Sequence, residues 1–215
     1  MRFIAFEKVI PQINKLSLPG LETQLKMAPS FRENLLERFK EAQKSAKLAA
    51  VLALFYPSGT GETNLVLILR KVYKGIHSAQ VGFPGGKPEI DDASLLDTAL
   101  RETWEEIGVS SDKITVLREL TPIYIPPSNF QVHPFIGISN KQLKFKLQVS
   151  EVDAVIEVPL SDFLNDDYEV TSKILDANGT THSVPAFKLK GQIVWGATAM
   201  VLVEIKTILN LVLKK

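Results

Sequence analysis

Three glutamates near the middle of the chain are spaced so that they could bind a divalent cation. Glu102, Glu105 and Glu106 stand at i, i+3 and i+4, and residues at that spacing share one face of a helix. Like charges so placed destabilise a helix by roughly 0.2–0.5 kcal/mol per pair. A hard cation such as Mg²⁺ offsets this repulsion, because it binds carboxylate oxygens together with waters and substrate phosphates. The spacing therefore predicts a metal site.

The residues around these glutamates favour a metal site over an ordinary solvated helix face, which the glutamates alone would indicate. Arg101 lies at the edge of the acidic stripe and can hold a carboxylate through paired hydrogen bonds. Gly85 and Gly86 allow close approach of the backbone, so a carbonyl oxygen there could become a further ligand. Asp92 is expected to cap the helix, and Gly108 to end it in a left-handed turn.

The segments around this helix alternate between strands and helices. Two apolar runs, 49–56 and 64–69, are separated by a turn and predict a strand pair. Further strands are expected at 116–125, 132–138, 152–158, 172–175 and 184–189, and helices at 92–107 and 195–213, with a short helix beginning at 159–162. The Asn178-Gly179 pair predicts a hairpin turn. This mixed order predicts an α+β fold or a three-layer α/β sandwich.

The first 46 residues are expected to form a helical arm that precedes a main domain at 47–215. The expected elements of the arm are a helix at 3–10 that Pro11 ends or kinks, a loop at 17–29, and a helix at 31–47 that Ser30 caps. We interpret the arm as a packing or dimer element. A homodimer through the arm or through an exposed strand is therefore one possible assembly.

Composition excludes several other classes of protein. The chain has 215 residues, 45% hydrophobic and 23% charged, as expected of a globular domain. It has 25 Lys and Arg against 24 Asp and Glu, so no nucleic-acid partner is expected. Cysteine is absent, which excludes a Cys-ligated zinc site and a thiol nucleophile. No signal peptide and no apolar window of about 18 residues is recognised, so we expect a cytoplasmic protein without a membrane partner.

The stretch from Gly86 to Val109 resembles the Nudix box, the motif of hydrolases that cleave nucleoside diphosphates linked to another moiety. The matching residues are Gly86, Arg101, Glu102, Glu105, Glu106, Gly108 and Val109. Asp92 stands at the first acidic position, where the family has Glu, and eight residues instead of seven separate it from Arg101. Thr103 replaces an apolar residue. The resemblance implies a Nudix-type α/β/α sandwich with a mixed sheet, and none of the departures removes an expected metal carboxylate.

The extra residue in the box resembles the coenzyme A pyrophosphatase branch of this family. The preceding motif, 77–86, and the Arg70 that follows the first long strands are also similar to that branch, and the resemblance spans roughly residues 49–205. Further similar segments are 123–130, 151–160 and 194–198. The branch usually has Arg, Gly, and Ser or Ala at the positions of Gly75, Ala79 and Lys71 respectively. These departures concern the substrate rather than the family.

The resemblance implies a metal-dependent hydrolysis with Mg²⁺ or Mn²⁺ as cofactor. Glu105 and Glu106 would be direct metal ligands, with the carbonyl of Gly85 beside them. Glu102 would be a further ligand or the general base. A residue of a later loop, here Glu151, is the alternative base.

The implied substrate is coenzyme A or an acyl-coenzyme A, cleaved to 3′,5′-ADP and 4′-phosphopantetheine or its acyl derivative. Arg101 would orient Glu102. The expected substrate contacts are Arg70, Lys71, Lys74 and His77, as candidates for the 3′-phosphate, together with Gln80 and Gly86. Two alternatives stay open: a Nudix hydrolase acting on ADP-ribose, a dinucleotide or a nucleoside triphosphate, and a non-catalytic nucleotide-sensing module.

Overall fold

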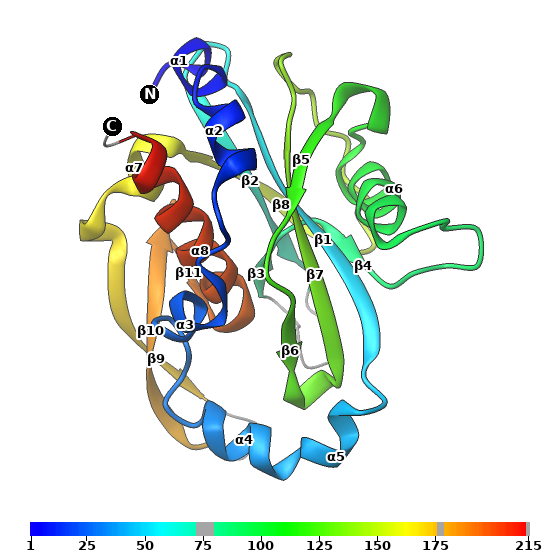
Figure 1. The fold of residues 1–215 in the computed structure, drawn as a ribbon, viewed down its shortest axis with the longest axis vertical. Coiled ribbons are helices and arrows are strands. Elements are labelled where there is room, and N and C mark those ends of the chain that lie inside the picture. The colour runs from blue at the N-terminus through cyan, green and yellow to red at the C-terminus, as the bar shows by residue number, and fades with distance from the viewer. Residues whose placement is uncertain (72–79, 176–178, 214–215) are drawn as a thin grey trace.

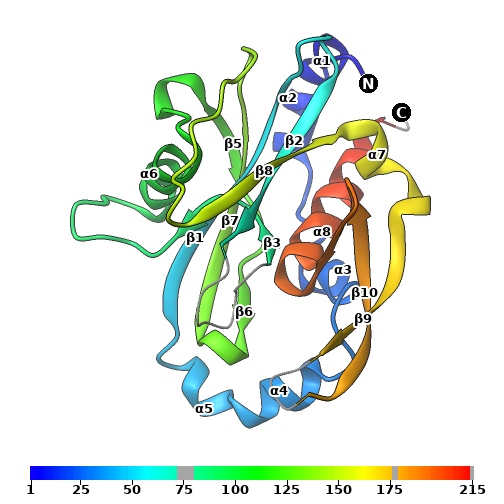
Figure 2. The ribbon, with the colours of Figure 1, turned by 180° about the vertical axis from the view of Figure 1, so that it is seen from behind.

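The computed structural model describes residues 1–71, 80–175 and 179–213. Within them, a mixed sheet of eight strands carries helices on both faces (Figure 1). Helix α6 (Leu95–Ile107) covers one face, and α8 (Gly196–Leu213) covers the other. A smaller sheet of three strands flanks α8 on its far side, as the view from behind also shows (Figure 2). The predicted α/β/α sandwich with a mixed sheet is confirmed.

Most of the predicted apolar runs form strands, but the run at 116–125 is interrupted at 120–122, and the strand at 192–195 was not predicted. The large sheet contains β1 (Lys47–Pro57), β2 (Thr63–Arg70), β3 (Val81–Gly82), β4 (Gly85–Gly86), β5 (Thr115–Glu119), β6 (Ile123–Ile125), β7 (Phe130–Ile138) and β8 (Val152–Pro159). Its order is β3-β2-β1-β7-β5, with β4 paired to β1, β6 to β7 and β8 to β2. The small sheet has the order β11-β10-β9, formed by β9 (Glu169–Leu175), β10 (Thr181–Leu189) and β11 (Gln192–Trp195).

Strand β1 lies at the centre of the sandwich and serves both layers. It pairs in parallel with β7 along 47–55, and its other edge pairs antiparallel with β2 at 55–57 and with β4 at 50–51. Because side chains alternate along a strand, Leu52 and Leu54 pack in the cluster that contains Ala99 of α6. Ala53 and Phe55 pack in the opposite cluster, which contains most of α8. Burial on both faces explains why β1 is apolar along nearly its whole length.

Helix α8 is the core helix between the two sheets. Its 18 residues are long and apolar enough to cross a membrane by length and composition alone, with a mean hydropathy of 1.6. No such stretch was predicted from the sequence, because the charged Glu204 interrupts the apolar run at 193–205. In the structure 61% of this window is buried inside the protein, and Glu204 and Lys206 are themselves buried. This burial is that of a core helix in a folded domain.

The N-terminal arm differs from its prediction at three places. Its helices are α1 (Phe3–Glu7), α2 (Ile10–Lys15), α3 (Gly20–Leu25), α4 (Arg32–Arg38) and α5 (Lys40–Gln43). Pro11 lies in the first turn of α2, where proline is tolerated, instead of only ending a helix. The expected loop at 17–29 contains α3, because its Thr23 and Gln24 are buried against the rest of the protein. The expected helix at 31–47 is interrupted at Phe39, and Ser30 does not cap it.

The arm shares the hydrophobic core of the main domain. Phe6 and Ile13 are completely buried in the same cluster as α8. The buried carboxylate of Glu204 accepts hydrogen bonds from the Gly20 N–H (3.2 Å) and from the Gln24 side chain (2.9 Å). The arm is therefore joined to α8 by both apolar and polar contacts. A division of the chain at residue 46 stays a prediction.

Replacing Glu204 tests how strongly the arm is held. Glu204→Ala removes the acceptor for Gln24, Gly20 and the Thr121 hydroxyl (2.6 Å), which leaves buried donors without partners. We expect the free energy of unfolding to fall by about 3 kcal/mol, measured by urea denaturation. Glu22→Ala, on the exposed face of α3, should change it by less than about 0.5 kcal/mol. Equal losses in the two variants would contradict this.

Candidate functional site

The box helix α6 begins three residues later than the sequence predicts. The hydroxyl of Ser94 accepts a hydrogen bond from the Asp97 N–H (3.2 Å), so Ser94, and not Asp92, is the N-cap. Gly108 ends the helix in the left-handed conformation (φ 73°), as predicted. The Asp92 carboxylate does not cap the helix and instead accepts hydrogen bonds from Arg101.

Arg101 and Asp92 form a bidentate ion pair beside the glutamates of α6. The Nε and Nη2 atoms of Arg101 each lie 3.0 Å from a different oxygen of Asp92, and the Thr98 hydroxyl donates to the same carboxylate (2.9 Å). These hydrogen bonds, chiefly those from Arg101, lower the pKa of Asp92 to about 2. Asp92 therefore stays ionised and fixes the guanidinium relative to α6.

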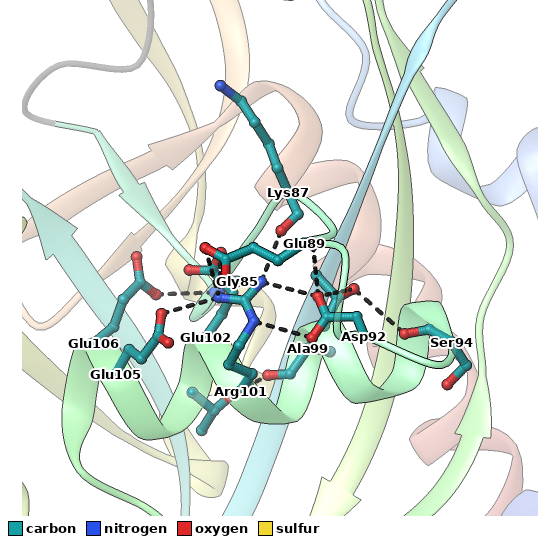
Figure 3. Close-up of polar contacts among 12 residues, drawn as sticks. Gly85, Lys87, Glu89, Asp92, Ser94, Ala99, Arg101, Glu102, Glu105 and Glu106 are labelled. Carbon is teal, nitrogen blue, oxygen red and sulfur yellow. Dashed lines mark hydrogen bonds and ion pairs between the residues drawn. The ribbon is translucent and has the colours of Figure 1, made fainter.

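The guanidinium of Arg101 also contacts two of the three glutamates (Figure 3). Its Nη1 atom donates to Glu105 (2.9 Å) and Glu102 (3.3 Å), and its Nη2 atom donates to the Lys87 carbonyl (2.8 Å). Burial raises the pKa of Glu102, and the charge of Arg101 opposes that rise. Arg101 thus positions more than the single carboxylate that the sequence analysis assigned to it.

The third glutamate has a different partner. The Glu106 side chain is only 1% exposed; it accepts hydrogen bonds from Nη1 of Arg70 and from the Gly85 N–H, both at 2.9 Å. Nη2 of Arg70 donates to the Gly85 carbonyl (2.7 Å). Burial raises the pKa of Glu106 to about 7, against the opposing charge of Arg70. Helical spacing placed all three glutamates together, whereas the structure divides them between two guanidinium groups.

A close backbone contact requires glycine at position 85, and a side chain at position 86 would displace the Glu102 carboxylate. Gly85 has a φ of 148°, and a Cβ atom there would lie 2.2 Å from the Ala50 carbonyl oxygen. A Cβ atom on Gly86 would lie 2.3 Å from a carboxylate oxygen of Glu102. The β4 segment pairs directly with β1 at these positions. The glycines therefore let the loop backbone and the α6 carboxylates approach each other, as the sequence analysis expected.

The remaining predicted site residues have separate positions. Lys71 is exposed, and its Nζ atom donates to the Val149 carbonyl (2.7 Å). Glu151 is exposed, and its charge contributes to the raised pKa of Glu106, so it lies within electrostatic reach of that carboxylate. Lys74 and His77 lie outside the described residues.

A cavity of about 410 Å³ adjoins the site at Arg70, Gly85 and Gly86. Gln80 also lines it. Much of the remaining lining is apolar and includes Phe31, Ile123, Ile125, Phe130, Trp195 and Met200. The segment 123–130, which the resemblance had singled out, thus forms one wall.

Two cavity residues, Arg32 and Trp195, were missed as site residues by the sequence analysis. Arg32 belongs to the arm, where no motif indicated a ligand contact. Trp195 lies in a segment similar to the branch, but an isolated tryptophan before an apolar helix is equally typical of a core residue. The three-dimensional fold alone brings them to the same cavity as Gly85.

The oxygen atoms at the site fit a hard cation in kind. As the side chains lie, no three His, Asp or Glu residues of the described part of the chain converge on a single metal position. The Gly85 carbonyl and the Glu106 carboxylate do converge on one positive group, the Arg70 guanidinium. Carboxylate and carbonyl oxygens are the donors that Mg²⁺ and Mn²⁺ prefer. The donor set therefore suits such an ion once Arg70 yields part of its contacts.

Comparisons with known proteins identify the family of this chain. The sequence matches the family model of the NUDIX domain over residues 46–177. The uncharacterized Nudix hydrolase NudL of Yersinia enterocolitica is 34% identical over 141 residues, which cover 66% of this chain and 71% of that protein. NudL of Yersinia pestis, also uncharacterized, is 33% identical over 141 residues, covering 66% and 70%.

One solved structure supports the fold. A MutT/nudix family protein from Enterococcus faecalis has a TM-score of 0.50 at 16% identity, over 84% of this chain and 70% of that one. The matched family range, 46–177, contains Arg70, both glycines and all of α6. Nudix hydrolases generally use divalent cations and cleave pyrophosphate bonds. From the family match and the NudL relatives together, we conclude that this chain belongs to the Nudix hydrolase family.

Proposed function

We propose that this enzyme hydrolyses the pyrophosphate bond of coenzyme A or acyl-coenzyme A, giving 3′,5′-ADP and 4′-phosphopantetheine or its acyl derivative. The observation that carries the proposal is that Arg70, which donates to both the Gly85 carbonyl and the Glu106 carboxylate, lines a largely apolar cavity. That cavity suits a nucleotide with an apolar or aromatic part. The similarity of 77–86 and of the extra box residue to the coenzyme A branch favours this substrate over ADP-ribose.

Glu105, Glu106 and the Gly85 carbonyl would hold Mg²⁺ or Mn²⁺, with Glu102 as a further ligand. When bound, the ion neutralises charge on the two phosphates and can acidify a water. Asp92 and Arg101 position two of these carboxylates through the ion pairs described above. This support keeps the oxygens at a defined place before substrate arrives.

The hydrolytic step needs a base and a route for the leaving oxygen. Water attacks one phosphorus, the bond from that phosphorus to the bridging oxygen breaks, and the oxygen leaves with the other phosphate. Glu102 has a raised pKa from burial, which suits proton acceptance. Glu151 is the alternative base, since its charge acts on Glu106 from outside α6. Arg70 would shift from Glu106 and Gly85 toward a substrate phosphate.

The substrate is tested by identifying products with mass spectrometry. Incubation with coenzyme A and Mg²⁺ in isotopically labelled water should give 3′,5′-ADP and 4′-phosphopantetheine, with the label in one product only. The labelled product identifies the phosphorus that water attacks. Efficient cleavage of ADP-ribose with coenzyme A left intact would contradict the proposed substrate.

Replacing one metal carboxylate tests the site itself. Glu106→Gln keeps the side-chain shape and one acceptor for Arg70, but removes the charge that a cation requires. We expect kcat to fall roughly 100-fold or more. We also expect the affinity for Mn²⁺, measured by electron paramagnetic resonance, to fall. Glu89→Gln is the matched control, because that side chain is 66% exposed at 3.9 Å from Arg101. Near-normal turnover in Glu106→Gln would contradict the assignment.

The affinity for metal should rise with pH up to about neutrality. Glu106 has its pKa raised to about 7, and a cation binds the deprotonated carboxylate, so binding below that pH releases a proton. The apparent Kd for Mn²⁺ should therefore fall about tenfold from roughly pH 6 to pH 8. In Glu106→Gln this dependence should disappear. A Kd of the unaltered enzyme that stays constant over this range would contradict a role for Glu106 as a ligand.

A further inference from the structure

Arg32 is a buried cation without a carboxylate partner. Its side chain belongs to α4, and the residue is 8% exposed. Nη2 donates to the Tyr124 carbonyl (2.8 Å), while Nε is buried without any hydrogen-bond partner. Among the described residues, none forms an ion pair with it. Burial lowers its pKa, and no nearby negative charge opposes that change.

Such an arrangement is costly for the free protein. A guanidinium removed from water loses its hydration, and the loss is offset only when an anion or several acceptors replace the water. One carbonyl oxygen satisfies one of its five N–H groups. A guanidinium that is largely buried, lines a cavity and has a single acceptor can therefore take further acceptors from a ligand in that cavity.

The cavity beside Arg32 has the positive charge that an anionic ligand requires. Arg32, Arg70 and Lys87 line it, whereas no Asp or Glu is found among the described residues of its lining. Cations around an otherwise largely apolar cavity favour a ligand that carries negative charge at more than one point. The Nζ atom of Lys87 lies 5.5 Å from the centre of the Phe130 ring, which is itself a cavity wall.

The two cavity arginines, Arg32 and Arg70, come from different parts of the fold. Arg70 ends β2 and contacts the proposed pyrophosphate site through Gly85, whereas Arg32 begins α4, which lies well away from α6 in both views (Figures 1 and 2). Apolar walls, including Ile125 and Trp195, complete the cavity. A matching ligand has a pyrophosphate, a flat or apolar middle and a second anionic group.

We propose that Arg32 is a specificity-determining residue that binds a second phosphate of the substrate, the one carried by the ribose outside the pyrophosphate. This inference rests on the proposed function, in which that group is the 3′-phosphate of coenzyme A. The phosphate supplies acceptors to the part of the guanidinium that lines the cavity. Arg32 takes the place of Lys71, whose Nζ atom is engaged by Val149, as the candidate for this contact.

Paired ligands that differ only in the 3′-phosphate test this proposal. Turnover of coenzyme A and of 3′-dephospho-coenzyme A is measured on the same sample of Arg32→Gln, so the ratio of the two kcat/KM values does not depend on the folded fraction. We expect this ratio to fall by between about tenfold and 100-fold relative to the unaltered enzyme. Arg32→Lys should restore part of it, because the charge is retained.

Direct binding keeps the test independent of turnover. By calorimetry the unaltered protein should bind 3′,5′-ADP at least about tenfold more tightly than AMP, and Arg32→Gln should remove the difference. Arg38→Gln makes the same change on the exposed face of α4 and should leave the difference intact.

The outcomes distinguish the proposed substrate from the proposed phosphate contact of Arg32. If coenzyme A is not cleaved but Arg32→Gln still abolishes the preference for 3′,5′-ADP, the proposed substrate is wrong and the phosphate contact stands. The other outcome is that coenzyme A is cleaved, but Arg32→Gln lowers turnover or binding of the ligands with and without the 3′-phosphate equally, or changes neither. Arg32 then only attaches α4 to the Tyr124 carbonyl, and this proposal is overturned. The absence of any preference for 3′,5′-ADP in the unaltered protein would also overturn it.

Discussion

The site depends on a carboxylate that the fold has removed from water. Glu106 is almost completely buried, and its oxygens are held by the Arg70 guanidinium and the Gly85 N–H. Removing Arg70 would leave the buried charge of Glu106 without a cationic partner, at a cost of several kcal/mol. Because Arg70 ends β2 and Gly85 lies in β4, this one carboxylate connects two strands to α6. A cation that replaced Arg70 at these oxygens would therefore bind to ligands that β4 and α6 already hold in place.

This arrangement depends on the register of β1. The same strand packs its Leu52 and Leu54 against the α6 layer and pairs Ala50 with Gly86. Helix and loop are therefore positioned from one backbone segment, which explains how the Glu102 carboxylate can lie against the loop where Gly86 has no side chain. A shift of one residue along β1 would turn Leu52 toward α8 and separate the two halves of the site.

The sequence was most informative where structure is local. The apolar runs predicted the strands, and the box predicted α6 and its end at Gly108, because these depend on neighbouring residues. Periodicity could not show that Glu106 meets Arg70, since 36 positions separate them. Nor could it show that Asp92 serves Arg101 while Ser94 caps the helix, because both residues can cap. The arm was predicted least well, since contacts with distant residues such as Glu204 determine its helices.

Under the two proposals, reaction chemistry and substrate choice come from different parts of this chain. The box, both glycines and Arg70 lie within the family range 46–177, whereas Arg32 and Trp195 lie outside it and still line the same cavity. A cavity wall outside the catalytic motif can change shape and charge without moving a metal ligand. This separation is a physical reason why a shared Nudix fold does not fix the substrate. If Arg32 binds the second phosphate, the first turn of α4 is where selectivity would differ among relatives that keep the same box.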